Sequence, residues 1–271
     1  MEIDLTGKFA LVGGSTDGIG KAIATRLAAS GASVCIMARN KSKLEKVVNE
    51  LDRSRNQKHK FLEVDFSNYN LFSKSIKYFF ETNHIDVLVN NTQGPEGGSA
   101  LEKSIDDYQS AFDLLFKCAV KTSLLALTNM RDKKWGRIIN VASISVKEPL
   151  NYLVLSNSLR SALVTWSKTL SVDIAKFNIT INNVLTGYFN TERLKQLNSK
   201  KAEKLGINIS TIEDKIKDTI PMKRFGNPEE YANLVCFLAS KKSDYITGIN
   251  IPIDGGFLKS LWVDFFYLGI N

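Results

Sequence analysis

The sequence predicts an α/β fold: a Rossmann-like, doubly wound parallel sheet with helices on both faces, in a single domain spanning residues 1–271. Two observations carry this prediction. Short, continuously apolar runs rich in β-branched residues recur along the chain, as is typical of strands that are buried on both faces of a sheet. The first two runs are separated by a segment with helical spacing of its apolar residues, which gives the order strand, helix, strand.

The expected strands begin close to the amino terminus. Residues 8–14 (KFALVGG) and 32–40 (ASVCIMARN) are the first two. The helix between them, residues 19–30, is predicted from apolar side chains at helical spacing and from Gly31, which follows it as a stop signal. Further apolar runs that predict strands follow at residues 60–66, 85–91, 136–143 and 179–185.

The composition favours one compact unit. The chain has 271 residues, 44% hydrophobic residues and only five prolines, and it contains no low-complexity linker or internal repeat. We expect no export signal and no membrane span, because no apolar run approaches the roughly 20 residues that a span needs. The aromatic tail at 257–271 is expected to pack on this subunit or on a partner.

The cysteines and the charge narrow the function further. Three cysteines, Cys35, Cys118 and Cys236, lack metal-ligand spacing, which predicts reduced core thiols in a cytoplasmic protein and no metal site. The net charge is +8, but the lysines are scattered among acidic residues. We therefore expect no nucleic-acid partner, and we expect the positive charge to favour a small anionic ligand.

A glycine-rich turn joins the first strand to the first helix. The stretch GGSTDGIG, residues 13–20, lies where a dinucleotide pyrophosphate can bind the amides of a helix N-terminus. The second strand ends near Arg39, 19 residues beyond Gly20 (39 − 20). An acidic residue at that place would bind a ribose 2′-hydroxyl, whereas an arginine suits a 2′-phosphate. Arg39 therefore predicts NADP(H) in preference to NAD(H).

Several further motifs follow this turn in a fixed order: EVDF containing Asp65, NNTQG at 90–94, WGRIINVAS at 135–143, LTGYFNT at 185–191, and RFGNPEEYANLVCFLAS before YITGINIPIDGG. In this order they resemble the motifs of the short-chain dehydrogenase/reductase family along nearly the whole chain. Gly13 stands where that family has a threonine, and Thr186 stands where it has a proline. The resemblance implies a Rossmann-like fold and, commonly, a homotetramer or homodimer.

The resemblance also implies which residues contact the cofactor. Arg39 and Arg160 are two of them, and Arg160 occupies the family's lysine position. The other expected contacts come from the glycine-rich turn, the strand ends and the loop after the sixth strand: Gly14, Ser15, Asp17, Gly18, Ile19, Gly20, Asp65, Asn91, Gly187 and Thr191. The family's catalytic serine falls at Ser143.

The chain departs from the family at the residues that carry the chemistry. Counting 13 residues from Ser143 gives Ser156 in place of the catalytic tyrosine, and four more give Arg160 in place of lysine. The family's structural asparagine falls at Leu115. A serine hydroxyl cannot be tuned toward the pKa range of a phenol, and an arginine stays charged and cannot relay protons. Hydride transfer is expected to survive, with a modified proton path.

Substitute proton donors remain open. Tyr188 lies near the expected nicotinamide pocket and is either a catalytic donor or a residue that shields the cofactor. Tyr152, expected one helical turn before Ser156, is either a donor or a packing residue. Lys147 and Glu148 follow Ser143 and are either pocket residues or solvent-facing charges.

Residues 188–221 are expected to form a lid over the substrate. The segment is polar and rich in lysine, and Gly206 interrupts it. Ser210 followed by Glu213 fits a capping box, and isoleucines that recur every fourth residue from Ile212 predict a short amphipathic helix. Such insertions commonly close over a substrate and set its identity.

Two functions are compatible with these features. The first is an NADP(H)-preferring oxidoreductase acting on a carbonyl or secondary alcohol, similar to a 3-oxoacyl reductase or to an alcohol or sugar dehydrogenase. The second is a catalytically inactive cofactor-binding protein with a sensing or scaffolding role, because a fold does not fix a function. The apolar residues of 112–127 and of the helix expected near Tyr152 are candidates for a subunit interface.

Overall fold

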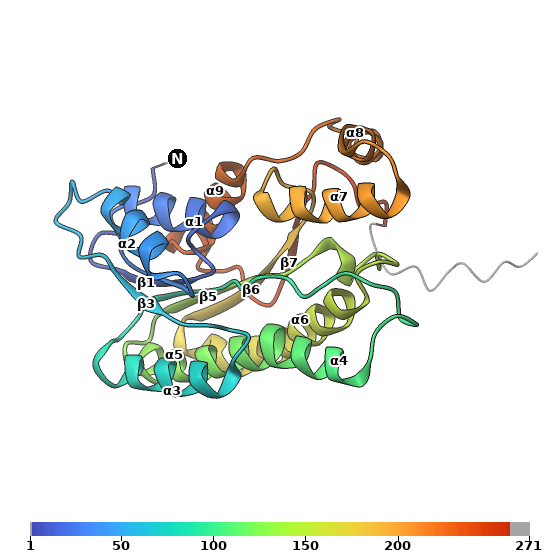
Figure 1. Cartoon of the computed structure of the whole chain (residues 1–271). Coiled ribbons are helices and arrows are strands. Elements are labelled where there is room, and N and C mark those ends of the chain that lie inside the picture. Colours follow the sequence, from blue (N-terminus) through green and yellow to red (C-terminus); the bar gives the residue numbers. More distant parts are fainter. Residues whose placement is uncertain (1, 261–271) are drawn as a thin grey trace, which may run out of the picture.

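The computed structural model describes residues 2–260. One parallel sheet of seven strands forms its centre, in the order β3-β2-β1-β4-β5-β6-β7, and helices cover both faces (Figure 1). The predicted fold class is therefore confirmed. The strands are β1 (Phe9–Gly13), β2 (Ser33–Ala38), β3 (Lys60–Glu63), β4 (Val87–Asn90), β5 (Gly136–Val141), β6 (Ile179–Thr186) and β7 (Asn250–Ile253).

The helices alternate with the strands as far as β6. They are α1 (Gly18–Ala29), α2 (Lys41–Glu50), α3 (Tyr69–Thr82), α4 (Ile105–Phe112), α5 (Cys118–Asp132), α6 (Val154–Ile174), α7 (Glu192–Leu205), α8 (Ile209–Thr219) and α9 (Pro228–Leu238). Because β1 lies between β2 and β4, the crossovers leave it in opposite directions, and the carboxyl ends of β1 and β4 flank the switch point. Ligands of doubly wound sheets bind in the crevice at such a point.

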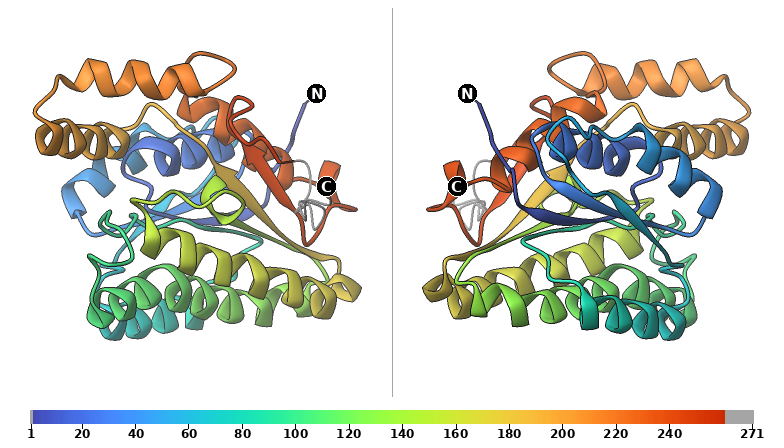
Figure 2. Two further views of the ribbon diagram at one scale, coloured as in Figure 1. Left: turned by 90° about the vertical axis from the view of Figure 1, so that its right-hand side faces the viewer. Right: turned by 90° about the vertical axis from the view of Figure 1, so that its left-hand side faces the viewer.

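Two apolar cores lie on opposite faces of the sheet. One contains buried residues of α1, α2 and α9, and the other contains those of α3, α5 and α6 (Figures 1 and 2). The continuous apolar strands are buried between these cores, which is why they read as unbroken runs in the sequence. Cys35, Cys118 and Cys236 are buried free thiols, as predicted.

A row of asparagines crosses four adjacent strands in register. Asn90 donates to Asn140 (2.8 Å), Asn140 donates to Asn183 (2.9 Å), and Asn183 donates to Asn250 (2.9 Å). Asn140 is fully buried, and leaving such an amide without a partner would cost about 1–3 kcal/mol. The row ties the four strands together, and Ser143 lies three residues after Asn140.

The residues expected to form a lid fold into a helical hairpin. Helices α7 and α8 pack together on the same side of the sheet as α1, α2 and α9 (Figures 1 and 2). The predicted capping box at Ser210 is wrong. Asn208 is the N-cap of α8 and accepts a hydrogen bond from the backbone N–H of Ser210 (2.9 Å), so the helix begins one residue before Ser210.

Some expectations concern parts of the chain beyond this description. Most of the aromatic tail falls within residues 261–271, outside the described residues. Among residues 2–260, no helix has the length and apolar character that crossing a membrane requires.

Strand β7 was not expected, because Pro252 weakens the strand pattern; the strand lies at the sheet edge, where proline is tolerated.

Candidate active site

The glycine-rich turn ends at the N-terminus of α1. Asp17 is the N-cap, and its carboxylate accepts a hydrogen bond from the N–H of Gly18 (2.7 Å). Ser15 is fully buried and has a structural role: its Oγ donates to the carbonyl of Val12 (2.8 Å) and accepts from the N–H of Met37 (3.1 Å). The side chain of Ser15 therefore joins β1 to β2 and holds the turn in place.

Close packing around the turn leaves no room for side chains. Asn91, which follows β4, donates through Nδ2 to the carbonyl of Gly13 (3.0 Å). A Cβ atom on Gly14 would lie 2.9 Å from that Nδ2, and φ is +53° at Gly14, a conformation that favours glycine. Gly187 is equally confined, because a Cβ atom there would lie 2.6 Å from the Cα of Asp254. These glycines are required by the backbone.

The N-termini of two helices meet at the turn. Thr191 is the N-cap of α7 and accepts from the N–H of Leu194 (3.2 Å), and its Cγ2 would lie 3.1 Å from a Cβ on Gly18. Helix N-termini carry partial positive charge and unpaired N–H groups, so this cradle suits a pyrophosphate. The residues fit the dinucleotide that the sequence predicts.

The adenosine end of the cradle lies at the ends of β2 and β3. Arg39 directly follows β2 and is exposed, and Asp65 lies two residues beyond β3. The hydrogen bonds of Ser67, and to a lesser degree the charge of Arg39, lower the pKa of Asp65. The structure therefore places both predicted adenosine contacts on neighbouring strands.

Ser143 follows β5 and begins a short 3-10 turn at residues 144–146. Its Oγ accepts a hydrogen bond from the N–H of Ser145 (3.1 Å), so that the hydroxyl hydrogen is available to a ligand. Ser143 is half-buried. A hydroxyl held in this way can donate to a carbonyl oxygen.

Ser156 and Arg160 lie one turn apart on α6 and contact each other. Arg160 Nε donates to Ser156 Oγ (3.1 Å), and Arg160 Nη1 donates to the carbonyl of Val141, the last residue of β5. Burial lowers the pKa of Arg160 to about 10, which still leaves it charged at neutral pH. Arg160 therefore ties the helix that carries Ser156 to the strand that carries Ser143.

Leu115 lies in a π-helical turn, residues 113–117, between α4 and α5. It is buried and lines a small cavity together with Asn90, Cys118 and Arg160. π-turns within helices frequently occur at functional sites. The backbone irregularity is present here, although a leucine supplies no polar group to the site.

Tyr188 and Tyr152 form a pair. Their hydroxyl oxygens lie 3.2 Å apart, and Tyr188 packs against a cluster of Ala142, Ile144 and Leu185. Burial is the main cause of a raised pKa at Tyr188, and the charge and hydrogen bond of Tyr152 raise it further. A phenol that acts as the catalytic acid needs a lowered pKa instead. The expected position of Tyr152 on a helix is wrong: α6 begins at Val154, and Tyr152 precedes it.

The two charged residues after Ser143 have different surroundings. Glu148 accepts hydrogen bonds from the backbone N–H groups of Lys259 (2.8 Å) and Ser260 (3.1 Å), and Lys147 is exposed. The exposure of Lys147 agrees with a solvent-facing charge, whereas the backbone of residues 259–260 holds Glu148.

Arg193, on the first turn of α7, was not found by the sequence analysis. Its Nη2 donates to the carbonyl of Pro95 (2.7 Å). Its guanidinium lies 3.5–3.9 Å from the position that a Cβ atom would take on Gly94. This arginine therefore reaches from α7 to the loop that follows β4. The only sequence signal was its position two residues after Thr191.

Comparisons with known proteins agree with this geometry. A family model described as enoyl-(acyl carrier protein) reductase matches residues 14–258. The 3-oxoacyl-[acyl-carrier-protein] reductase FabG of Aquifex aeolicus is 31% identical over 257 residues, which cover 94% of this chain and 99% of that protein. The NADPH-dependent reductase BacG of Bacillus subtilis is 33% identical over 254 residues, which cover 93% of this chain and 98% of that protein.

A solved structure shows the same architecture. The L-sorbose reductase of Gluconobacter frateurii, complexed with NADPH and L-sorbose, has a TM-score of 0.89 and 30% sequence identity to this chain, covering 96% of this chain and 100% of that one. The strand order, the two-helix cradle and these matches over nearly the full length lead to one conclusion. The chain belongs to the short-chain dehydrogenase/reductase family.

Proposed function

We propose that the chain is an NADP(H)-dependent oxidoreductase that interconverts a carbonyl and a secondary alcohol through a reaction centre of Ser143, Ser156 and Arg160. The observation that carries the proposal is the double anchoring of Arg160, to Ser156 on its own helix and to Val141 at the end of β5. A hydroxyl and a fixed cation are thereby kept together at the positions where the family motifs predict tyrosine and lysine.

NADP(H) is the cofactor that the chain's own residues and its relatives support. Arg39 is exposed at the end of β2, where a 2′-phosphate would lie, and an arginine can bind a phosphate through two parallel hydrogen bonds. BacG is named as NADPH-dependent, and the sorbose reductase was solved with NADPH. Bound NADPH supplies the hydride that reduces the carbonyl carbon.

The residues of the chain then have separate roles. Ser143 donates to the substrate oxygen and orients the carbonyl, and Arg160 supplies positive charge and donors toward the nicotinamide ribose. Because Ser156 Oγ accepts from Arg160, its own O–H is available to the substrate oxygen or to a water. On reduction, a proton passes through that hydroxyl from water, since Arg160 stays charged.

A kinetic screen tests this function. The intact protein is incubated with NADPH and a panel of ketones, sugars and 3-oxoacyl thioesters, and loss of the nicotinamide absorbance is followed. Turnover that Ser143→Ala reduces at least about tenfold supports the proposal. No turnover on any compound, with NADPH shown to be bound, contradicts it.

The second function, a cofactor-binding protein without catalysis, is favoured by one observation. The reaction centre lacks an acid of suitable pKa, because burial raises the pKa of Tyr188 and Leu115 is apolar. This alternative predicts tight NADPH binding, no turnover in the screen, and a change of assembly or partner binding when NADPH is added.

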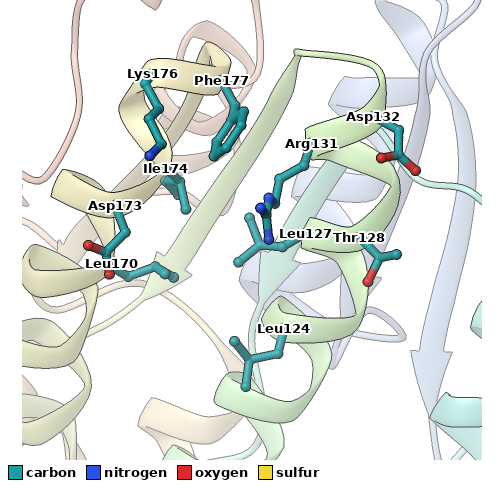
Figure 3. Close-up of a pocket in the computed structure, with 10 residues that line it drawn as sticks. All are labelled: Leu124, Leu127, Thr128, Arg131, Asp132, Leu170, Asp173, Ile174, Lys176 and Phe177. Carbon is teal, nitrogen blue, oxygen red and sulfur yellow. The ribbon is translucent and has the colours of Figure 1, made fainter.

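Self-association is also proposed, as a homodimer or homotetramer. An apolar groove runs between α5 and α6, and Figure 3 shows Leu124, Leu127 and Leu170 lining it between the two helices. Leu124 is half exposed, at 52%. A second copy of the chain would cover such a surface.

We also place the protein in the cytoplasm, because its cysteine thiols are free and buried.

A further inference from the structure

The chain leaves the sheet after β7 as a short segment, residues 254–260, which we call the strap. The strap contains no helix or strand, yet each of its backbone N–H groups from 256 to 260 donates a hydrogen bond. Asp254 accepts three of them, from residues 256 (3.0 Å), 257 (3.3 Å) and 258 (2.9 Å). Glu148 accepts the other two, from Lys259 (2.8 Å) and Ser260 (3.1 Å). Two acidic residues thus hold the whole backbone of the strap.

The strap packs against the turn that carries Ser143. Ala142 and Ile144, the neighbours of Ser143 on either side, are buried in a small apolar cluster, and Phe257 packs against this cluster from the strap. Phe257 also meets Tyr188 edge to face, with the ring centroids 5.3 Å apart. One aromatic side chain of the strap is therefore in contact with both the serine turn and the tyrosine that follows β6.

Glu148 connects the strap to the serine turn a second time. It lies five residues after Ser143 (148 − 143), and its Oε1 also accepts from Ser260 Oγ (3.2 Å). Burial by itself raises the pKa of Glu148, but the hydrogen bonds from Lys259 and Ser260 outweigh it, and the pKa is lowered. The acceptor is therefore an ionised carboxylate at neutral pH, and hydrogen bonds to such a group are roughly twice as strong as those between neutral groups.

A reacting hydroxyl must be held within about 0.5 Å of its working position by residues that support it. We propose that Glu148 is a positioning residue for the reaction centre: by clasping the strap, it fixes the turn that carries Ser143. The inference rests on the proposed function and adds to it a residue that acts through the strap. Phe257 is the side chain through which the clasp presses on the turn.

Proteolysis measures the clasp itself. Lys259 is exposed, and trypsin can cleave after it once the backbone of Lys259 and Ser260 leaves Glu148. Mass spectrometry follows the release of residues 260–271 from the native protein. Glu148→Ala should speed the release about tenfold or more, because three hydrogen bonds to an ionised group are lost. Glu148→Gln, whose amide oxygen still accepts, should lie between. Glu45→Ala makes the same change at an exposed position of α2 and should release at the wild-type rate.

Hydrogen exchange tests whether the clasp reaches the serine turn. The backbone N–H groups of residues 145–147 donate to Ser143 and Ile144 within this turn, and mass spectrometry follows their exchange. Glu148→Ala and Phe257→Ala should each speed this exchange about fivefold or more. The double variant should exceed the faster single variant by less than about twofold, because both changes remove the same support. Neither proteolysis nor exchange needs a substrate.

Kinetics separate positioning from a general loss of structure. With a substrate from the carbonyl screen, Glu148→Ala should lower kcat about fivefold or more, because Ser143 is no longer held in place. The Kd for NADPH should stay within about twofold of the wild type, since the clasp does not touch the pyrophosphate cradle at Gly18 and Thr191. Glu148→Gln should recover part of kcat, and circular dichroism checks that each variant is folded.

Each measurement can overturn the inference. A release of residues 260–271 that is no faster in Glu148→Ala would remove the clasp, and exchange in the turn that neither variant changes would remove its effect on Ser143. A wild-type kcat in Glu148→Ala, or equal losses of kcat and NADPH affinity, would remove the positioning role. If no compound is turned over, the proposed oxidoreductase fails by itself, whereas faster release together with faster exchange would keep Glu148 as the residue that positions the turn.

Discussion

Arg160 Nε donates a 3.1 Å hydrogen bond to Ser156 Oγ, and the two residues stand at the positions where the family motifs predict a catalytic lysine and tyrosine. The bond makes the hydroxyl an acceptor toward the arginine and leaves its hydrogen for a ligand. A second bond from Arg160 to Val141 fixes this arrangement relative to Ser143. The serine and the arginine therefore form one hydrogen-bonded unit.

The first prediction concerns this arginine. Arg160→Ala should weaken NADPH binding by about 1–3 kcal/mol, because a charged donor near the nicotinamide ribose is lost. Arg160→Lys should recover part of the affinity. Fluorescence titration with NADPH measures both, and an affinity unchanged in Arg160→Ala would show that the guanidinium does not contact the cofactor.

The second prediction concerns cofactor choice. NADP⁺ should bind more tightly than NAD⁺, and Arg39→Ala should remove most of the difference. The 2′-phosphate takes up a proton with a pKa near 6, so the preference should shrink as the pH falls from 7.5 to 5. Parallel titrations of both cofactors test this, and equal affinities in the wild-type protein would refute the role of Arg39.

The third prediction concerns the pH profile of reduction. The pKa of Arg160, lowered by burial to about 10, remains well above neutrality, and burial raises the pKa of Tyr188. A serine hydroxyl does not ionise in this range. We therefore expect kcat for carbonyl reduction to stay nearly level from pH 6 to 9. A clear inflection between pH 6.5 and 8.5 would point to a different proton donor.

The fourth prediction concerns stability. The side chain of Arg137 is 1% exposed, and it donates to the carbonyls of Gly136 (2.7 Å), Asn178 (3.1 Å) and Ser240 (3.3 Å) and pairs with Asp244. Arg137→Met removes these donors, two of which bind the buried carbonyls of Gly136 and Ser240. We expect a loss of about 3 kcal/mol or more in the free energy of unfolding, measured with urea. A change below about 1 kcal/mol would contradict this role.

The fifth prediction concerns association. Leu124→Glu places a charge in the groove between α5 and α6 and should shift the protein toward monomer in light scattering at micromolar concentration. Tyr78→Glu is the control, because Tyr78 is exposed on α3 and lies outside the groove. This change should leave the assembly unchanged. A wild-type protein that is already monomeric would remove the proposed interface.

The features that the sequence predicted well are local. The buried strands appear as continuous apolar runs, and the turn before α1 is marked by glycines that the backbone needs, such as Gly14 with its positive φ. Family motifs singled out Ser143 and Thr191, which the structure places after β5 and at the N-cap of α7. In each of these cases the signal lies within a few residues of the feature.

The features that it missed depend on contacts between distant parts of the chain. Arg193 meets Pro95 across 98 residues, and Tyr152 meets Tyr188 across 36. Neither pairing leaves a periodic pattern in the sequence. The start of α8 was misplaced for a different reason: Asn208 and Ser210 are both good N-caps, and only the folded backbone shows which of them caps the helix.

The most direct test of the reaction centre compares turnover with cofactor affinity in Ser156→Ala. With a substrate found in the carbonyl screen, the account predicts an unchanged Kd for NADPH and a fall in kcat of at least about tenfold, because Ser156 supplies the hydroxyl next to the reacting oxygen while Arg160 holds the cofactor. An unchanged kcat in Ser156→Ala would contradict the account.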